Sequence, residues 1–242
     1  MQNYKILGLG AHPDDLELMA GGTLAKYVRA GHKVTMASLT NGNMGHKIIT
    51  PEELARVRKK EMEASTKVIG ADMEWIGFPD EFLFCENKET RLKVTDVIRK
   101  ANPDIIITHS PTDYHPDHRA AYHLVFAASF LATVPHIKTA HPAIEKVPII
   151  YCMDTLGGFG FQPDVFIDIT DTFQIKREAL SKHQSQIKWM KEHDNIDFID
   201  WMRVIAEFRG LQSGVKYAEA YSLEKRWPAI PAMNTLIPFS SY

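Results

Sequence analysis

The sequence predicts a single α/β domain in which helices cover both faces of a mostly parallel central sheet. Apolar runs of strand length alternate with longer helical patterns along the 242 residues, and this alternation is typical of βαβ units. The hydrophobic fraction of 45% and the charged fraction of 24% are ordinary for a globular protein, and α/β chains of this length commonly form one domain. We therefore expect a Rossmann-like fold of three layers.

The strands are predicted from apolar runs. KILGLGA and KVTMASLT are the first two of these runs. IIITHS at 105–110 is so rich in β-branched residues that it is expected near the centre of the sheet, where both faces of a strand are buried. In chain order, the expected strands are 5–11, 33–40, 73–78, 105–110, 148–154 and 164–169.

The helices are predicted from amphipathic patterns and from their end signals. Thr50 as N-cap, Pro51 at the first helical position and Glu53 in a capping box predict a helix that ends near Ile69. An earlier helical pattern stops at Gly31, a common kind of helix end. The other expected helices are 16–30, 90–101, 118–132 and one long helix over 170–190 with its cap at 170–172.

Composition excludes several classes of function. With a formal net charge of −2, the chain has no electrostatic basis for binding nucleic acid or an anionic membrane surface. No apolar run is long enough to span a bilayer, and the N-terminus lacks the pattern of a signal peptide. Cys85 and Cys152 form neither a CxxC pair nor a disulfide framework, which favours a reducing compartment. We therefore expect a cytoplasmic protein.

The C-terminal residues differ in composition from the rest. The segment 223–242 (LEKRWPAIPAMNTLIPFSSY) holds three prolines and many apolar side chains, with neither helical nor strand periodicity. Such a segment is too apolar for a solvated linker. We expect a domain over 1–222 and a tail over 223–242 that packs on its own domain or on a neighbouring subunit.

Titratable side chains gather after the first and the fourth predicted strand. In a doubly wound sheet these two strands are neighbours, and ligands bind at the carboxyl ends of the strands where the strand order reverses. We therefore expect the two clusters to meet. The first consists of His12, Asp14 and Asp15, and the second of His109, Asp113, His115, Asp117 and His118.

The residue types and their spacing suit a hydrolytic metal site. His12 and Asp15 lie three residues apart at a helix start, so both side chains can point to one side. A histidine of the second cluster would complete a three-ligand zinc site with an open position for water, whose pKa zinc lowers from 15.7 to about 7. Asp14 would accept a proton from that water. A protonated histidine held by Asp117 would stabilise an oxyanion and protonate the leaving amine.

Two other interpretations compete with the metal site. In one, the aspartates only cap the helix after the first strand, and HPDH at 115–118 only opens the next helix. In the other, Gly8 and Gly10 begin a dinucleotide-binding GxGxxG motif, but Pro13 stands where the third glycine belongs. The joint placement of two clusters at neighbouring strand ends favours the metal site.

Several longer stretches resemble a known family. AHPDDLELMAGGTLAKYVRAGHKV, together with HPDH, resembles the PIG-L/LmbE family of zinc-dependent deacetylases. RKKEMEASTKVIGA, ALSKHQSQ and RGLQSGVKYAEAY also resemble family segments, so the similarity covers about 5–221. The resemblance implies the zinc ligands His12, Asp15 and His118, the general base Asp14, and His115 as the oxyanion-stabilising acid supported by Asp117.

By the same resemblance, the protein is expected to hydrolyse the acetamide of an N-acetylglucosamine-type small molecule and to form trimers or hexamers. Iron, cobalt or manganese can replace zinc at sites of this type. The alternatives are a hydrolase of the same mechanism that acts on a non-sugar amide or an ester, and a metal- or sugar-binding protein without turnover. The presence of Asp14 speaks against a pure binder, which needs no base beside an open metal position.

The candidate substrate contacts rest on weaker sequence signals than the metal ligands do. Arg58 either contacts substrate or forms a surface salt bridge, and Asp154 either reaches a ligand or caps the next turn of the chain. His109 is expected to be structural or a partner of a ligand, while His183 faces the site or lies on a helix surface. The residues expected to contact substrate are Asn43, Arg58, Asp113, Tyr114 and Asp154.

Overall fold

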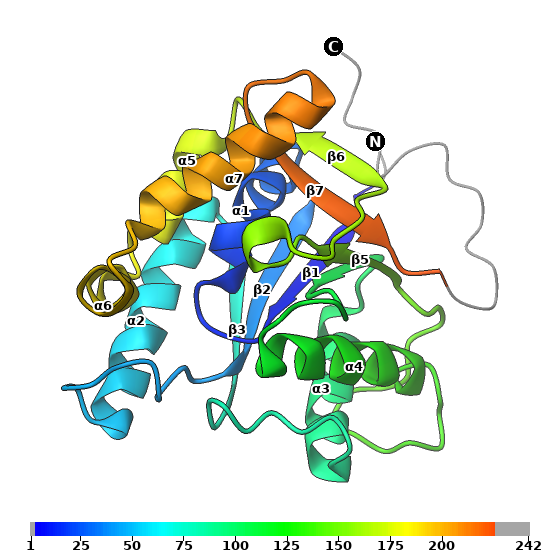
Figure 1. Ribbon diagram of the computed structural model, residues 1–242. Coiled ribbons are helices and arrows are strands. Elements are labelled where there is room, and N and C mark those ends of the chain that lie inside the picture. The colour runs from blue at the N-terminus through cyan, green and yellow to red at the C-terminus, as the bar shows by residue number, and fades with distance from the viewer. Residues whose placement is uncertain (1–2, 226–242) are drawn as a thin grey trace.

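Seven strands form one sheet in the order β3-β2-β1-β4-β5-β7-β6 in the computed structural model, which describes residues 3–225 (Figure 1). The strands from β1 to β5 pair in parallel, and β7 lies antiparallel between β5 and β6. This mostly parallel sheet confirms the predicted fold class. The strands are β1 (Lys5–Gly10), β2 (Lys33–Thr40), β3 (Asp72–Phe78), β4 (Ile105–Thr108), β5 (Ile149–Met153), β6 (Val165–Asp168) and β7 (Ala218–Leu223).

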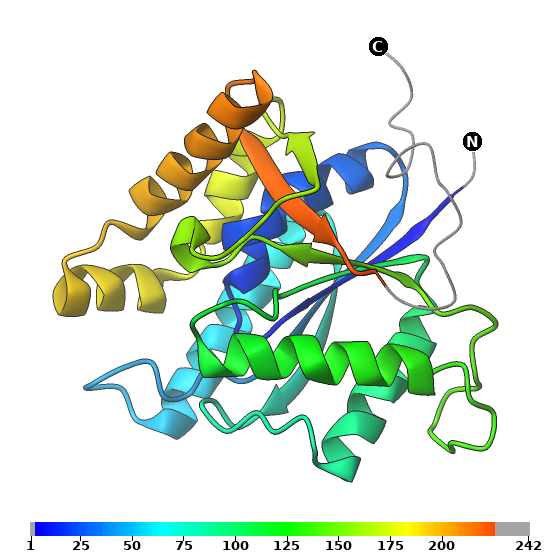
Figure 2. The same cartoon turned by 45° about the vertical axis from the view of Figure 1, so that its right-hand side comes forward.

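Helices cover both faces of the sheet and give the molecule three layers (Figures 1 and 2). One group of five helices packs on one face, and α3 and α4 pack together on the other. Side chains of β1 alternate between the two cores, so Ile6 packs on the α1 side and Leu7 on the α4 side. The helices are α1 (Asp15–Arg29), α2 (Pro51–Ile69), α5 (Phe173–Leu180), α6 (Gln184–Asp194) and α7 (Phe198–Ser213) on the first face, α3 (Lys88–Ala101) and α4 (Pro116–Leu131) on the second, and a short 3-10 helix at Leu156–Gly158.

Length and apolar character decide whether any of the helices could span a membrane. Within residues 3–225, none of them combines the length and the apolar character that a span requires.

The six predicted strands all occur, with ends that differ by at most two residues from the predicted ones. The long helix predicted over 170–190 is wrong, because α5 and α6 are separate helices with a break at 181–183. The break buries the His183 side chain completely. It also lets the Ser185 side chain donate a hydrogen bond of 2.6 Å to Glu61 on α2. Tertiary contacts therefore override the helical pattern here.

The C-terminal end of the sheet was not predicted. α7 and β7 were both missed, since β7 depends on pairing with β5 and β6 and has little signal of its own. β7 ends at Leu223, and the N–H of Glu224 donates to the carbonyl oxygen of Ile150 at 3.0 Å. Residues 223 and 224 therefore continue the sheet, and residues 226–242 of the predicted tail lie outside the described residues.

The strand order reverses between β1 and β4, which are neighbours as predicted. This reversal is where open α/β sheets bind ligands. β1 ends at Gly10, and the chain turns sharply into α1. A Cβ at Gly10 would lie 3.2 Å from the Cβ of Asp15 and 3.3 Å from the carbonyl oxygen of His12. The small residue thus keeps the first titratable cluster close to the end of the strand.

Candidate active site at the strand ends

Three side chains from the two predicted clusters meet at one point. His12 Nδ1 lies 3.3 Å from Asp15 Oδ2, His118 Nε2 lies 3.3 Å from Asp15 Oδ1, and the two histidine nitrogens are 3.2 Å apart. The two distances to Asp15 run to its two different carboxylate oxygens, so the carboxylate faces both imidazoles at once. His118, His109 and His12 lower the pKa of Asp15 well below its ordinary value although burial alone would raise it. The ionised carboxylate and two imidazoles form a donor set that fits a divalent metal ion.

Other triplets of nearby donor atoms overlap with this one. His12, His115 and His118 form one such group, and His12, Asp80 and Asp117 another, each with ligand atoms within 4.8 Å of one another. His12 belongs to both groups because each of its ring nitrogens faces a different neighbour. The site is therefore a dense cluster of donors rather than an isolated triad.

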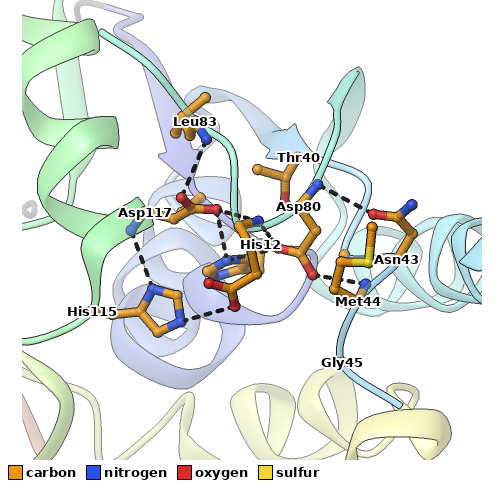
Figure 3. A network of polar contacts seen from close by, with 12 residues as sticks. His12, Thr40, Asn43, Met44, Gly45, Asp80, Leu83, His115 and Asp117 are labelled. Carbon is orange, nitrogen blue, oxygen red and sulfur yellow. Dashed lines mark hydrogen bonds and ion pairs between the residues drawn. The ribbon is translucent and has the colours of Figure 1, made fainter. Parts of the chain in front are cut away.

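Asp80 holds the far side of the His12 ring (Figure 3). Its Oδ1 lies 3.1 Å from His12 Nε2, while its Oδ2 accepts a hydrogen bond from the N–H of Met44 at 3.2 Å. Burial would raise the pKa of Asp80, but the hydrogen bond and the charge of His12 lower it to about 2. A carboxylate in this position fixes the tautomer and orientation of a metal-binding histidine. Sequence analysis missed Asp80, although it follows the third strand at the same edge of the sheet.

Asp113 plays the equivalent part for His118. Its Oδ2 lies 3.1 Å from His118 Nδ1 and accepts a hydrogen bond from the N–H of Leu156 at 3.3 Å. Its Oδ1 accepts a hydrogen bond from the N–H of His115 at 3.0 Å. The carboxylate is buried and both of its oxygens face these protein groups, while its substrate contact stays a prediction.

Asp14 is a buried carboxylate beside the donor triad. Its Oδ1 lies 2.9 Å from Nη2 of Arg58, and its side chain makes no capping hydrogen bond to α1. The interpretation that Asp14 merely caps the helix is therefore wrong. Burial raises the pKa of Asp14 above its ordinary value, and Arg58 offsets only part of this rise.

Arg58 is buried, so its predicted surface salt bridge is also wrong. Besides Asp14, its guanidinium donates hydrogen bonds to the carbonyl oxygens of Gly42 at 3.1 Å and Pro13 at 3.3 Å. Gly42 has a φ of +61°, and a Cβ there would collide with the guanidinium. The loop after β2 thus closes over Arg58 only because residue 42 is glycine.

His115 is the N-cap residue of α4, so the capping interpretation is correct for this part of HPDH. Its Nδ1 accepts a hydrogen bond from the N–H of Asp117 at 3.2 Å, which places the ring proton on Nε2. Burial, together with His12 and His118, lowers the pKa of His115 to about 4. The imidazole is therefore neutral at neutral pH, in contrast to the protonated histidine expected from sequence.

The Asp117 carboxylate binds the loop after β3, and only the backbone N–H of Asp117 contacts the His115 ring (Figure 3). It accepts hydrogen bonds from the N–H groups of Glu81 at 2.9 Å and Leu83 at 3.3 Å, and its Oδ2 lies 3.5 Å from His12 Nε2. The prediction that the Asp117 side chain supports His115 is corrected accordingly. Its position instead ties the loop after β3 to the start of α4.

Three further residues that the sequence singled out are buried and contact other protein groups. His109 is buried, and its Nε2 accepts a hydrogen bond from the N–H of Ala11 at 2.9 Å, which agrees with a structural role. His183 is buried 3.2 Å from Glu17 Oε1, so its predicted surface position is wrong. Asp154 is buried in a two-contact ion pair with Arg209, and its contact with a ligand stays a prediction.

Two of the predicted substrate contacts lie nearer the surface. Asn43 is half-buried, and its side-chain oxygen accepts a hydrogen bond from the N–H of Asp80 at 3.2 Å. Tyr114 is 63% exposed beside His115, with ring centroids 6.1 Å apart. Asn43 therefore links two loops of the site, whereas Tyr114 offers its ring and hydroxyl to solvent at the rim.

Two deacetylases and a hydratase are similar to this chain in sequence. A diacetylchitobiose deacetylase of Thermococcus kodakarensis is 30% identical over 223 residues, which cover 89% of this chain and 81% of that protein. A Bacillus cereus protein named "Probable N-acetyl-alpha-D-glucosaminyl L-malate deacetylase 2" is 33% identical, over 77% of this chain and 86% of that protein. A 4-oxalmesaconate hydratase of Pseudomonas putida is 26% identical, over 72% of this chain and 70% of that protein. The sequence similarity thus extends to more than one reaction.

Solved structures share the fold as well. The N,N'-diacetylchitobiose deacetylase of Pyrococcus horikoshii, solved with an inhibitor, superposes with a TM-score of 0.79 at 27% identity, over 91% of this chain and 84% of that one. The model of the family described as PIG-L, GlcNAc-PI de-N-acetylase, matches residues 7–129, which include both histidine and aspartate clusters. On these matches, the chain belongs to the PIG-L family.

Proposed function

We propose that this protein is a metal-dependent deacetylase that removes the N-acetyl group from an N-acetylglucosamine-containing small molecule. The names of the Thermococcus and Bacillus relatives support this substrate class. The observation that carries the proposal is a close triad of metal-ligand side chains beside a buried carboxylate, Asp14, which that triad does not use. A metal ion and a base within one cluster are what hydrolysis of an amide requires.

In this proposal His12, Asp15 and His118 hold the metal, which we take to be zinc. Two imidazole nitrogens and one carboxylate oxygen are typical ligands of hydrolytic zinc, and iron, cobalt or manganese also accept them. A metal ion held there would supply polarisation of the amide carbonyl and a lower pKa of water. Asp80 and Asp113 keep the two imidazoles oriented, since each lies 3.1 Å from the ring nitrogen that does not face the triad.

Asp14 is assigned as the general base. Its raised pKa brings the carboxyl closer to working pH, where a base both accepts and releases a proton efficiently. Arg58 contacts Oδ1 and fixes the plane of the carboxylate, so we assign proton transfer to Oδ2. Asp14 takes a proton from the attacking water and delivers it to the amide nitrogen as the C–N bond breaks. The products are acetate and the free amine.

His115 is assigned as the donor to the developing oxyanion. Because its Nδ1 accepts the Asp117 N–H, its Nε2 carries a proton that it can donate to the acetyl oxygen. A neutral imidazole suffices for this hydrogen bond. The proton for the leaving amine then comes from Asp14, which differs from the sequence-based expectation that a histidine supplies it.

The proposal also covers a substrate contact by Tyr114, the domain bounds, the oligomeric state and the cellular location. Tyr114, exposed at the rim, is proposed to contact the sugar or its substituent, since exposed aromatic rings pack well on the apolar faces of sugars. We also propose a domain over 1–222, a homo-oligomer of three or six copies and a cytoplasmic location. Small-molecule substrates are the only partners that this proposal requires.

A second reaction needs a test because of one relative. The Pseudomonas protein is named a hydratase, and it shares 26% identity with this chain. A hydratase adds water across a carbon–carbon double bond and releases no acetate, so the two reactions have different products. A hydrolase of non-sugar amides or esters, and a binder without turnover, also compete with the proposed deacetylase.

The deciding experiment is metal analysis coupled to an acetate-release assay on a panel of N-acetylglucosamine conjugates, simple esters and unsaturated dicarboxylic acids. We expect bound metal in wild-type protein, acetate release from at least one conjugate, and loss of both in His12→Ala. Undiminished activity in a metal-free His12→Ala variant would contradict the proposal. Hydration of an unsaturated acid without any acetate release would favour the hydratase.

A further inference from the structure

A stripe of aromatic rings runs along one face of α4. Tyr122, Phe126 and Phe130 occur at intervals of four residues, which places them on one face of a helix. The rings of Tyr122 and Phe126 stack with centroids 6.1 Å apart. Phe126 is 37% and Phe130 56% exposed. We call these three residues the α4 stripe.

The described chain ends beside the first ring of this stripe. β7 ends at Leu223, and the Tyr122 hydroxyl donates a hydrogen bond of 2.8 Å to the Glu224 carboxylate. The N–H of Glu224 is held by the carbonyl oxygen of Ile150 at 3.0 Å. Both views show β7 pointing toward the α4 side of the sheet at this end (Figures 1 and 2). The segment after Lys225 therefore starts near Tyr122.

The composition of that segment suits an aromatic surface. Residues 226–242 carry one charged side chain, Arg226, and three prolines. Prolines remove backbone donors and favour an extended polyproline conformation, which aromatic surfaces bind in other proteins. The apolar side chains that it offers include Trp227, Ile230, Met233, Leu236, Ile237 and Phe239.

The segment is also long enough. Extended chain spans about 3.1 Å per residue, so the 17 residues of 226–242 reach about 50 Å. The α4 stripe from Tyr122 to Phe130 spans eight helical steps, about 12 Å. Because Glu224 is anchored at one end of the stripe, docking is intramolecular and takes place at a high effective concentration.

We propose that residues 226–242 dock on the α4 stripe of their own chain. Docking covers the exposed parts of Phe126 and Phe130 and buries apolar side chains of a segment that is too apolar to stay solvated. It also braces the helix whose first turn carries His118, although the contact itself does not depend on the proposed activity. A second copy of the chain is the competing occupant.

A double-mutant cycle tests the contact. The variants are Phe130→Ala, a truncation after Lys225, and both together, compared by melting temperature. Phe130→Ala and the truncation should each lower the melting temperature by about 2–4 °C, and the double variant should melt no lower than the truncation alone. Additive effects would overturn the proposal.

Leu211→Ala is the matched control. Leu211 is 81% exposed near the C-terminal end of α7, as Phe130 is near that of α4. Any effect of Leu211→Ala should add to that of the truncation, since this side chain lies on another helix. The same non-additivity at Leu211 as at Phe130 would mean that truncation perturbs the whole fold, and would overturn the assigned surface.

A second measurement uses the full-length chain and does not require the truncation to fold. The emission of Trp227, isolated by difference from Trp227→Phe, should shift to longer wavelength in Phe130→Ala and stay unchanged in Leu211→Ala. No shift in Phe130→Ala would contradict docking. The emission should also be independent of protein concentration, because a shift on dilution would assign the α4 stripe to a second copy.

Discussion

The Asp80 carboxylate lies 3.1 Å from Nε2 of His12, on the opposite side of the ring from Asp15 and His118. An Asp80→Ala variant should therefore bind metal 10–100-fold more weakly, because the imidazole loses the partner that fixes its orientation. Titration with a metal indicator measures this. Asp80→Asn keeps an acceptor oxygen and should lose less. Unchanged metal affinity with a raised KM would show instead that Asp80 acts on the substrate.

Asp14 should be required for turnover and dispensable for metal. Asp14→Asn keeps the shape of the side chain but cannot accept the proton of water, so kcat should fall by about 10²–10⁴-fold. Metal content, measured by elemental analysis, should stay that of the wild type, since Asp14 contacts Arg58 and lies outside the donor triad. Loss of metal in this variant would show that Asp14 is a metal ligand and not only a base.

Replacing Gly42 should lower activity, an effect that the strain of its positive φ alone would not cause. Gly42→Ala meets both a positive φ of +61° and the Arg58 guanidinium, whereas Gly31→Ala meets a φ of +83° in open space. Gly31→Ala should cost about 1–2 kcal/mol of unfolding free energy with normal kcat. Gly42→Ala should cost more and lower kcat as well, because Arg58 must move away from Asp14. Chemical denaturation and initial rates measure the two effects, and equal behaviour of the variants would refute this account of the loop.

Asp154 should be a stability residue. Asp154→Ala leaves the buried Arg209 guanidinium without its partner, at a cost of about 3–5 kcal/mol in unfolding free energy. Asp171→Ala removes an exposed partner of Lys26 and should cost less than about 1 kcal/mol. Urea unfolding compares the variants. A stable Asp154→Ala protein with a raised KM would support the substrate contact predicted from sequence.

The sequence was most informative where chemistry and secondary structure share a few residues. HPDD follows the first strand, and HPDH lies in the segment after the fourth, so the rules of parallel sheets predicted that the two clusters meet. The family resemblance then selected His118 from the second cluster. Asp80 also follows a strand, but FPDEF contains a single aspartate at the end of a weak strand and carries no comparable signal. The role of Asp80 becomes visible only in the structure, where it faces Nε2 of His12.

Buried polar residues on helices were the main source of error. An arginine at position 58 fits the solvated face of an amphipathic helix equally well, and only the closure of the loop after β2 buries it. The break before α6 likewise depends on the burial of His183 and on the contact of Ser185 with Glu61. Such contacts join residues that are far apart in the chain. The periodicity of apolar residues within one helix gives no information about them.

The antiparallel position of β7 between β5 and β6 sets the order in which the sheet can be completed. During synthesis, β5 keeps an open edge and β6 has no neighbour until residues 218–223 leave the ribosome. An unpaired edge next to a core strand recruits other chains. A nascent chain that stalls after α7 is thus prone to aggregate, and among the described residues β7 is the strand that covers both open edges.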